Sequence, residues 1–226
     1  MQNSLKKICK NGTLRVAYNI GNQALIQSVD NSYLGVSPAL AQRLANEIDA
    51  QIIPIIYESA GNVLSDTVSN AWDVGFLAIN KPRAEKVTFT NPYSTIDITY
   101  AVHANSSLYH TKDIDRKGIN IVTSSGSAYE IYLNKTLKNA KLKYSGTPFE
   151  SFFEFQVGSY DAVVGVRASL EQYFNENKNI RILHGTLTSV KQAMVLPIHN
   201  NPRIAALNIF LDNAVADGFF NPYTNI

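Results

Sequence analysis

Cysteine is nearly missing from this 226-residue chain, since Cys9 is the only one. One thiol cannot form an internal disulfide, and neither Cys nor His recurs at the spacing of a metal site. The four histidines are dispersed, as expected for ordinary surface or loop residues: His103, His110, His184 and His199. The sequence therefore predicts no metal and no cofactor.

Long apolar runs and an excess of one charge are also missing. No apolar run reaches the roughly 18 residues that a membrane-spanning helix needs. The chain carries 20 Lys and Arg against 18 Asp and Glu, with the cations scattered, which argues against a nucleic-acid partner. Residues 1–12 lack the apolar centre of a secretory signal. The chain is therefore either cytoplasmic or begins near a mature terminus, and its polar start fits the second option well.

Hydrophobic residues are plentiful instead, at 45% against 17% charged residues. That balance supports a substantial core and disfavours disorder. A length of 226 residues is near the upper limit for one core, so we expect one large domain or two lobes of about 100 residues.

The first half of the chain shows a β-α-β-α-β pattern. The predicted elements are a strand at 14–18, a helix from Ser37, a strand at 51–57, a weaker helix at 62–70 and a strand at 73–79. Ser37-Pro38 is a typical helix start, with Ser37 as cap and Pro38 in the first turn. Leu40, Leu44 and Ile48 then give one apolar face. The isoleucine-rich strand that follows is expected to be buried on both sides.

The same pattern repeats in the second half. The predicted elements are a strand at 119–123, a helix after Gly126-Ser127, a strand at 142–144, a helix at 148–156, a strand at 161–166 and a helix through Tyr173. We expect Trp72 and the group Phe149, Phe152 and Phe153 to pack in the core.

Two further extended stretches, 98–103 and 190–196, connect these halves, and a helix at 202–217 ends the chain. Its apolar face is expected to hold Ile204, Leu207, Leu211 and Val215. The economical path returns this helix to the first lobe. The sequence thus predicts an α/β fold with two crossings and a hinge, lobe 1 being 1–98 plus 191–226 and lobe 2 being 99–190. A ligand cleft is expected at the carboxyl ends of the strands.

Several stretches carry a family resemblance: 14–18, 35–44, 72–75, 83–93, 119–133 and 158–164. Together they resemble the polar amino-acid-binding family of extracellular solute-binding proteins over nearly the whole chain. The resemblance implies a type II periplasmic-binding fold and capture of a small carboxylate-bearing ligand between the lobes. It also implies a monomer that delivers to an ABC permease, in the periplasm, with its signal peptide removed.

Arg83 is the first candidate ligand-binding residue. It stands where the resemblance places an arginine that grips a carboxylate, and a guanidinium fork binds carboxylates through two parallel hydrogen bonds. The alternative is a solvated loop arginine. Ser127 and Ala128 form the second candidate element, because a helix start offers free N–H groups to an anion. Ser127 can also simply cap its helix, and the two roles can coexist.

Four further residues are candidates for ligand binding. Asn19 and Asn22 would supply amide hydrogen bonds in place of the aromatic pattern common in the family, or else shape a turn. Ala78 lies in the segment from Asp73 to Arg83, which is two residues shorter than is usual in the family, and this difference could shift the register of Ala78 and Asn80 relative to the ligand. Glu58 follows a strand, where it either binds an ammonium or hydroxyl group or stabilises the next helix start.

One departure from the family concerns the ligand's charge. Amino-acid binders usually carry an acid five positions after the aspartate that here is Asp161, to pair with the ligand's ammonium group. That position is Val166, and the cation Arg167 follows it. Our hypothesis is that Arg83 and Arg167 favour an anionic ligand such as a dicarboxylate or keto acid. Alternatively, Arg167 faces solvent at a helix start.

Two other functions compete with uptake. Some proteins of this fold are cyclohexadienyl dehydratases, and Glu58 is the acid that could protonate a leaving group. No activated nucleophile or phosphate loop accompanies it. The fold also serves as the ligand-sensing module of receptors, which would require a separate partner.

Overall fold

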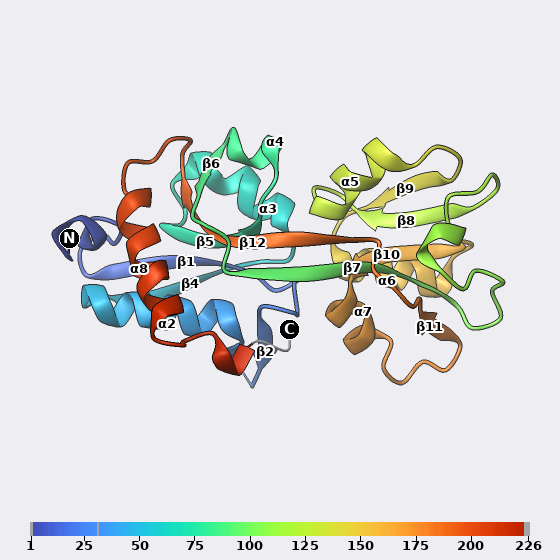
Figure 1. Ribbon diagram of the computed structural model, residues 1–226, viewed down its shortest axis with the longest axis horizontal. Helices are drawn as coiled ribbons and strands as arrows, with labels where there is room; N and C mark the ends of the chain where they lie inside the picture. The colour runs from blue at the N-terminus through green and yellow to red at the C-terminus, as the bar shows by residue number, and fades with distance from the viewer. Residues whose placement is uncertain (1, 31, 224–226) are drawn as a thin grey trace. The chain divides into compact units, whose positions relative to one another are not determined.

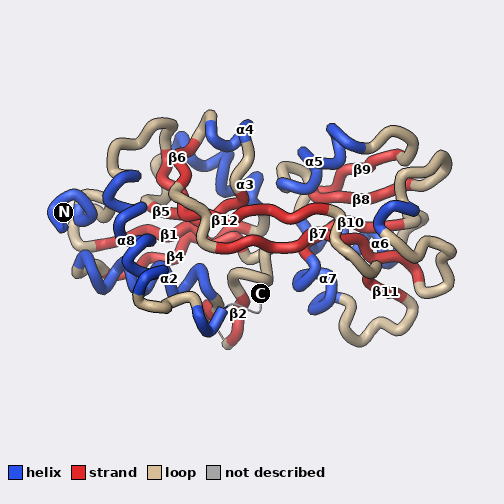
Figure 2. The backbone as a smooth tube through the Cα atoms, in the orientation of Figure 1, coloured by secondary structure: helices blue, strands red, loops and turns tan. Residues whose placement is uncertain are grey.

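The computed structural model describes residues 2–30 and 32–223 and has a mixed α/β fold (Figures 1 and 2). It divides into two compact units. Unit 1 comprises Met1–Ile20, Leu25–Thr95 and Lys191–Ile226, and unit 2 comprises Gly21–Ala24 and Ile96–Val190. Two long strands, β7 (Ser94–His103) and β12 (Thr188–Pro197), each run from one unit into the other.

The sheet of unit 1 has the strand order β4-β1-β5-β12. Its parallel strands are β1 (Thr13–Asn19), β4 (Gln51–Tyr57) and β5 (Val74–Ala78). β12 runs antiparallel to β5 and also pairs with β6 (Val87–Phe89). Because β1, β4 and β5 are parallel, their carboxyl ends lie at one edge of the sheet.

Helices cover both faces of this sheet. On one face, α2 (Val36–Ile48) and α8 (Ile204–Ala216) share an apolar core with α1 (Gln2–Lys6). On the other face, α3 (Ala60–Ser65) packs with Trp72, which is buried as expected. The predicted helix at 62–70 is therefore α3 followed by a 3-10 turn at Asp66–Ser69.

Three local expectations for unit 1 were wrong. The cap of α2 is Gly35, and the Ser37 hydroxyl is bonded instead to the Tyr93 hydroxyl at 3.2 Å. β4 is not buried on both sides, because it is the edge strand, and all of its residues are exposed or half-buried. Val215 is 58% exposed, since the buried face of α8 passes through Phe210 and Ala214.

The sheet of unit 2 has the strand order β7-β10-β8-β9, and β11 (Ile180–Ile182) pairs with β7. β8 (Asn120–Ser124), β9 (Lys141–Ser145) and β10 (Ala162–Val166) are parallel, while β7 is antiparallel to β10. The carboxyl ends of β8, β9 and β10 therefore lie at one edge.

The helices of unit 2 are α5 (Ala128–Thr136), α6 (Pro148–Val157) and α7 (Arg167–Tyr173). Their core is rich in aromatic rings, including Phe152, Phe155 and Phe174. Phe152 is buried as expected, and Phe149 packs against the core. Phe153 is 57% exposed, because Phe155 rather than Phe153 lies one helical turn after Phe152.

The shortest elements gave no sequence signal, because three to five residues are too few to show a periodicity. They are α1, β6, β11, the hairpin of β2 (Gln27–Val29) and β3 (Ser32–Leu34), α4 (Lys81–Ala84), and 3-10 turns at Thr111–Asp113 and Asn221–Tyr223.

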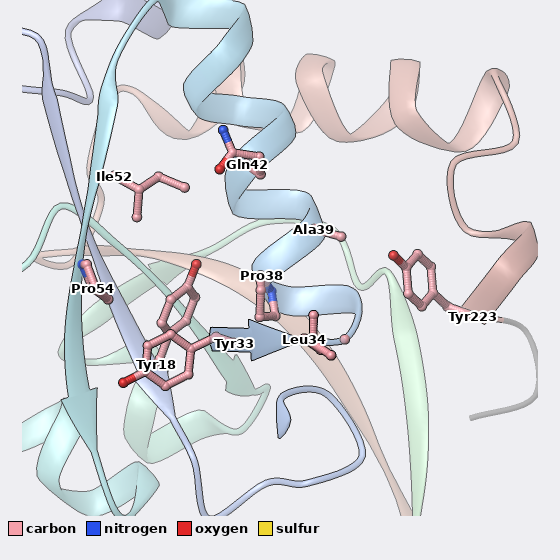
Figure 3. Close-up of a pocket in the computed structure, with 10 residues that line it drawn as sticks. Tyr18, Tyr33, Leu34, Pro38, Ala39, Gln42, Ile52, Pro54 and Tyr223 are labelled. Atoms are coloured by element: carbon pink, nitrogen blue, oxygen red, sulfur yellow. The ribbon is translucent and has the colours of Figure 1, made fainter. Parts of the chain in front are cut away.

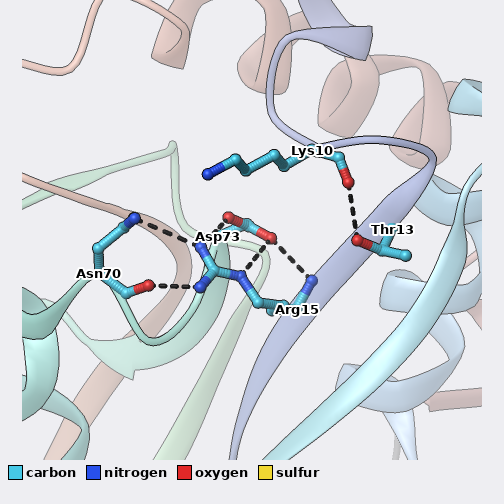
Figure 4. A network of polar contacts seen from close by, with 5 residues as sticks. All are labelled: Lys10, Thr13, Arg15, Asn70 and Asp73. Carbon is cyan, nitrogen blue, oxygen red and sulfur yellow. Dashed lines mark hydrogen bonds and ion pairs between the residues drawn. The ribbon is translucent and has the colours of Figure 1, made fainter.

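An ion pair fixes the amino ends of β1 and β5 in unit 1 (Figure 4). The Arg15 guanidinium donates to Asp73 at 2.7 and 3.1 Å, and the Arg15 backbone N–H donates to the same carboxylate at 2.9 Å. The guanidinium also donates to the carbonyl of Asn70. The hydrogen bond to Asp73 raises the pKa of Arg15. The network therefore connects the turn before β5 to β1. It lies at the opposite end of these strands from their carboxyl ends.

Candidate functional site

Polar side chains gather at the carboxyl edge of unit 1. Asn19 ends β1 opposite Tyr57 of β4, and Asn80 follows the end of β5. Among the described residues, the Asn19 Oδ1 and the Asn80 Nδ2 are buried without a hydrogen-bond partner. Buried amide atoms are normally paired, so these two atoms at one strand edge are candidates for hydrogen bonds to a group outside the described chain.

Arg83 lies at this same edge and is 2% exposed, so it is not a solvated loop arginine. Asn80 caps the short helix α4 by accepting the Arg83 backbone N–H at 3.0 Å. This turn folds the side chain back onto β5, where its Nη1 donates to the Ala78 carbonyl at 2.9 Å. The structure thus brings Arg83 and Ala78 together and holds a buried guanidinium at the end of a strand.

Glu58 directly follows β4 and is exposed. It does not cap α3, because that role belongs to Ser59, whose hydroxyl accepts the Asn62 backbone N–H at 3.2 Å. Its carboxylate is therefore left at the surface beside the start of α3.

In unit 2, Ser127 and Ala128 form the tip of α5 beyond the end of β8. The expectation that Ser127 caps its helix is confirmed, since its hydroxyl accepts the Glu130 backbone N–H at 3.0 Å. The Glu130 carboxylate in turn accepts the Gly126 N–H at 2.5 Å. One backbone donor of this tip is therefore already used by the protein itself.

Asn19 and Asn22 belong to different units. Asn19 is part of unit 1, whereas Asn22 lies in Gly21–Ala24, which is part of unit 2. There the Gln23 backbone N–H donates to the Ser169 hydroxyl of α7 at 3.1 Å. The side-chain oxygens of Asn22 and Gln23 are both buried without a partner in the described chain. Gln23 was missed from sequence, although it directly follows Asn22 in the same polar loop.

Arg167 begins α7 at the carboxyl end of β10 and is held by several groups. Its Nη2 donates to the Gly185 carbonyl at 2.5 Å and to the Leu183 carbonyl at 3.4 Å. Its Nη1 lies 3.5 Å from a Glu171 carboxylate oxygen. Val166, just before it, is 8% exposed and caps the helix without a side-chain hydrogen bond.

Asp97 is an acid near Arg167 that sequence reasoning missed. Its carboxylate accepts the Ser189 hydroxyl at 2.7 Å and the Thr186 hydroxyl at 2.9 Å. These hydrogen bonds, with the charge of Arg167, lower the pKa of Asp97. No local pattern could reveal this group, because Thr186 and Ser189 lie about 90 residues further along the chain.

A separate hollow of about 350 Å³ lies in unit 1, between the β2–β3 hairpin, the first turns of α2 and β4 (Figure 3). The rings of Tyr18 and Tyr33 stand 5.4 Å apart in it, and burial raises the pKa of Tyr18 to about 12. Pro38 and Pro54 complete an apolar wall. None of the candidate ligand-binding residues lines this hollow.

The class of protein follows from the architecture and is confirmed by solved structures: this is the type II periplasmic-binding fold. A mutant of ArgBP from T. maritima has a TM-score of 0.82 and 18% identity, covering 97% of this chain and 96% of that one. A binding component of an ABC transporter from Wolinella succinogenes, complexed with lysine, has a TM-score of 0.80 and 21% identity, covering 95% and 94%. At such identities these structures establish the fold alone.

The chain belongs to the bacterial extracellular solute-binding proteins, family 3, whose model matches residues 14–223. The resemblance seen in the sequence is thereby confirmed, and the protein is a solute-binding protein. An ancestral amino acid-binding protein, a precursor of cyclohexadienyl dehydratase, also shares the fold, with a TM-score of 0.81, 20% identity and 98% coverage of both chains. None of the curated proteins matches this chain. Within residues 2–30 and 32–223, no helix has the length and apolarity needed to span a membrane.

Proposed function

We propose that this protein captures a small carboxylate-bearing molecule and delivers it to an ABC permease, with Arg83 as the carboxylate-binding group. One observation carries the proposal. The Arg83 guanidinium is 2% exposed and lies against the Ala78 carbonyl at the carboxyl end of β5. Ligands of open α/β sheets bind outside this end of the strands.

A buried cation favours an anionic partner. Removing a guanidinium from water is costly unless acceptors replace the lost hydration. A carboxylate supplies two acceptor oxygens in the spacing of the guanidinium fork. Amino acids, keto acids and dicarboxylates all present such a group. The structures of relatives bound to lysine and to glutamine support an amino-acid-like ligand.

Unit 2 carries the other candidate groups of this proposal. The α5 tip with Ser127 and Ala128 provides backbone donors, and the Asn22 amide oxygen still lacks a partner in the described chain. Family membership supports a location outside the cytoplasm, in the periplasm, after removal of a signal peptide. The protein would act there as a monomer that a permease recognises with ligand bound.

Ligand capture is tested with the purified protein. We expect native mass spectrometry to reveal a co-purified small molecule, and calorimetry with L-amino acids, 2-oxo acids and dicarboxylates to give one-to-one binding. The matched control is the same amino acid with its carboxylate converted to an amide, which removes the partner of Arg83. Equal affinity for the amide would rule out carboxylate recognition.

The related dehydratase precursor favours one alternative, an enzyme in which Glu58 acts as general acid. Glu58 is exposed directly after β4, beside the start of α3. We infer that the protein binds without chemistry, and we expect no turnover of prephenate or arogenate in an absorbance assay. Turnover that disappears in Glu58→Gln would replace the binding function by a dehydratase.

A further inference from the structure

The hollow of unit 1 has rigid and uncharged walls (Figure 3). It measures about 350 Å³ and lies between the β2–β3 hairpin, the first turns of α2 and β4. Pro38 and Pro54 form part of its walls, and the fixed φ of proline leaves little backbone freedom to lose when a ligand enters. None of the described residues that line the hollow carries a charge. The hollow is therefore preformed and suits an uncharged occupant.

Tyr18 gives this hollow a buried polar group that lacks a partner in the described chain. Its side chain projects from β1 to the α2 side of the sheet, lines the hollow and is 3% exposed. Its ring packs against those of Tyr33, 5.4 Å away, and Phe76, 6.4 Å away, which fixes its orientation. Within residues 2–30 and 32–223, no hydrogen bond joins its hydroxyl to another residue. Buried hydroxyl groups are normally hydrogen-bonded, so this one is available to a ligand.

The chemistry of the Tyr18 hydroxyl favours a neutral ligand with a hydrogen-bond acceptor. Burial, with a smaller contribution from Tyr33, raises the pKa of Tyr18 to about 12, so the group is an O–H donor at neutral pH. A charged ligand would be costly here, because no described side chain of opposite charge lines the hollow. The Tyr33 ring and the side chains of Ile52 and Pro54 provide apolar contact, which suits an aromatic ring.

The size of the hollow favours a small molecule over a protein partner. Ligand pockets have volumes of roughly 300–1,000 Å³, so this hollow lies at the lower end of that range. An apolar cavity of about 150 Å³ is enough for a benzene ring, so the hollow has room for two fused rings. A stable protein interface covers about 800 Å² on each partner, which is more than this hollow provides.

We propose that the hollow is a second binding site, and that its ligand is a neutral molecule of one or two aromatic rings with a hydrogen-bond acceptor for the Tyr18 hydroxyl. The proposal goes beyond the capture of a carboxylate by Arg83. Arg83 does not line the hollow, and the two ligand classes differ in charge. The two sites are therefore expected to bind their ligands independently.

Quinoline is a suitable probe, because its two fused rings carry one acceptor nitrogen. Naphthalene is the matched control, with the same shape and no acceptor. The backbone amide signals of Gly35, Ala39 and Gln42, which line the hollow, report binding in a nuclear magnetic resonance titration. We expect saturable shifts with a dissociation constant of about 0.1–1 mM for quinoline, unchanged in Arg83→Ala. Quinoline that shifts none of these signals would overturn the proposal.

Tyr18→Phe tests the hydrogen bond, because it removes the hydroxyl and keeps the ring. We expect the affinity for quinoline to fall about fivefold, which corresponds to one neutral hydrogen bond, while the affinity for naphthalene stays the same. An equal change for both probes would contradict recognition of an acceptor by Tyr18.

Ala39→Trp tests the location, because it fills the hollow from α2, and it is expected to abolish binding of both probes. Ala205→Trp makes the same change at an exposed position of α8 and should leave binding intact. Thermal unfolding checks that both variants are folded. Probe binding that survives Ala39→Trp would reject the site. Light scattering identifies another occupant: a wild-type dimer that Ala39→Trp dissociates would show that a second copy of the chain covers the hollow, and would also reject the proposal.

Discussion

Arg83→Lys is expected to weaken carboxylate binding about 100-fold, and Arg83→Ala by more. Each hydrogen bond to a charged group contributes about 1.5–3 kcal/mol, so a two-bond fork contributes about 3–6 kcal/mol. Lysine retains the charge but presents a point donor on a flexible stem, so it cannot form both bonds in the fixed geometry. It would also lose the bond from Nη1 that seats the side chain on the Ala78 carbonyl. Calorimetry with the tightest wild-type ligand measures this loss.

Solution scattering gives an independent measurement of the same residue. In general, a ligand that contacts two lobes at once favours their closed state, so on the proposed function the wild-type protein is expected to become more compact when ligand is added. Arg83→Ala should abolish that change, with a far-ultraviolet circular dichroism spectrum like that of the wild type. Arg203→Ala is the matched control, because it makes the same change at an exposed arginine at the start of α8. Undiminished compaction in Arg83→Ala would show that the ligand is held elsewhere.

Gly35→Ala is expected to cause a large loss of stability in unit 1. Gly35 caps α2 with φ 113° and ψ −179°, a conformation adopted almost only by glycine. A Cβ there would lie 2.6 Å from the Leu25 carbonyl oxygen and 3.0 Å from its carbon. The backbone cannot yield freely, because the Ser37 N–H donates to that same carbonyl at 3.1 Å.

The expected cost combines two terms. Backbone strain contributes about 1–3 kcal/mol and the forced displacement of packed backbone about 1–3 kcal/mol more. Denaturant unfolding followed by circular dichroism measures the sum. Gly12→Ala measures backbone strain alone, because Gly12 has φ 71° and nothing lies within 4 Å of the added Cβ. We expect this variant to lose about 1 kcal/mol of stability. Equal losses in the two variants would show that contact with Leu25 does not matter.

Local signals predicted most of the secondary structure of this chain. The spacing of Leu40, Leu44 and Ile48 marked α2, and all three are buried. Ser127 marked the start of α5 and caps it. Both signals act within a few residues of chain, which is the range over which periodicity and capping operate. The signal failed for the cap of α2, because a backbone contact with Leu25 and not the capping propensity of Ser37 decides that turn.

Only part of the candidate site could be predicted from the sequence. Arg83 could be named because the family resemblance places a carboxylate-binding arginine at its position, yet its burial and its bond to Ala78 depend on how α4 turns back onto β5. Asp97 could not be named, because its partners Thr186 and Ser189 come from the other end of the chain. Their meeting depends on the path that brings β12 and the residues before it alongside the start of β7.

By itself, the sequence determined the alternation of strands and helices, the family, and the residue types available at the strand ends. Apolar periodicity, caps and turn residues depend only on residues close together along the chain, so they can be recognised without a structure. Only the tertiary structure decided the surroundings of the charged groups: Arg83 is buried against the Ala78 carbonyl at the end of β5, and Arg167 lies near Asp97 and Glu171. Charge pairing depends on distances between residues far apart in sequence, and those distances exist only once strand order and register are fixed.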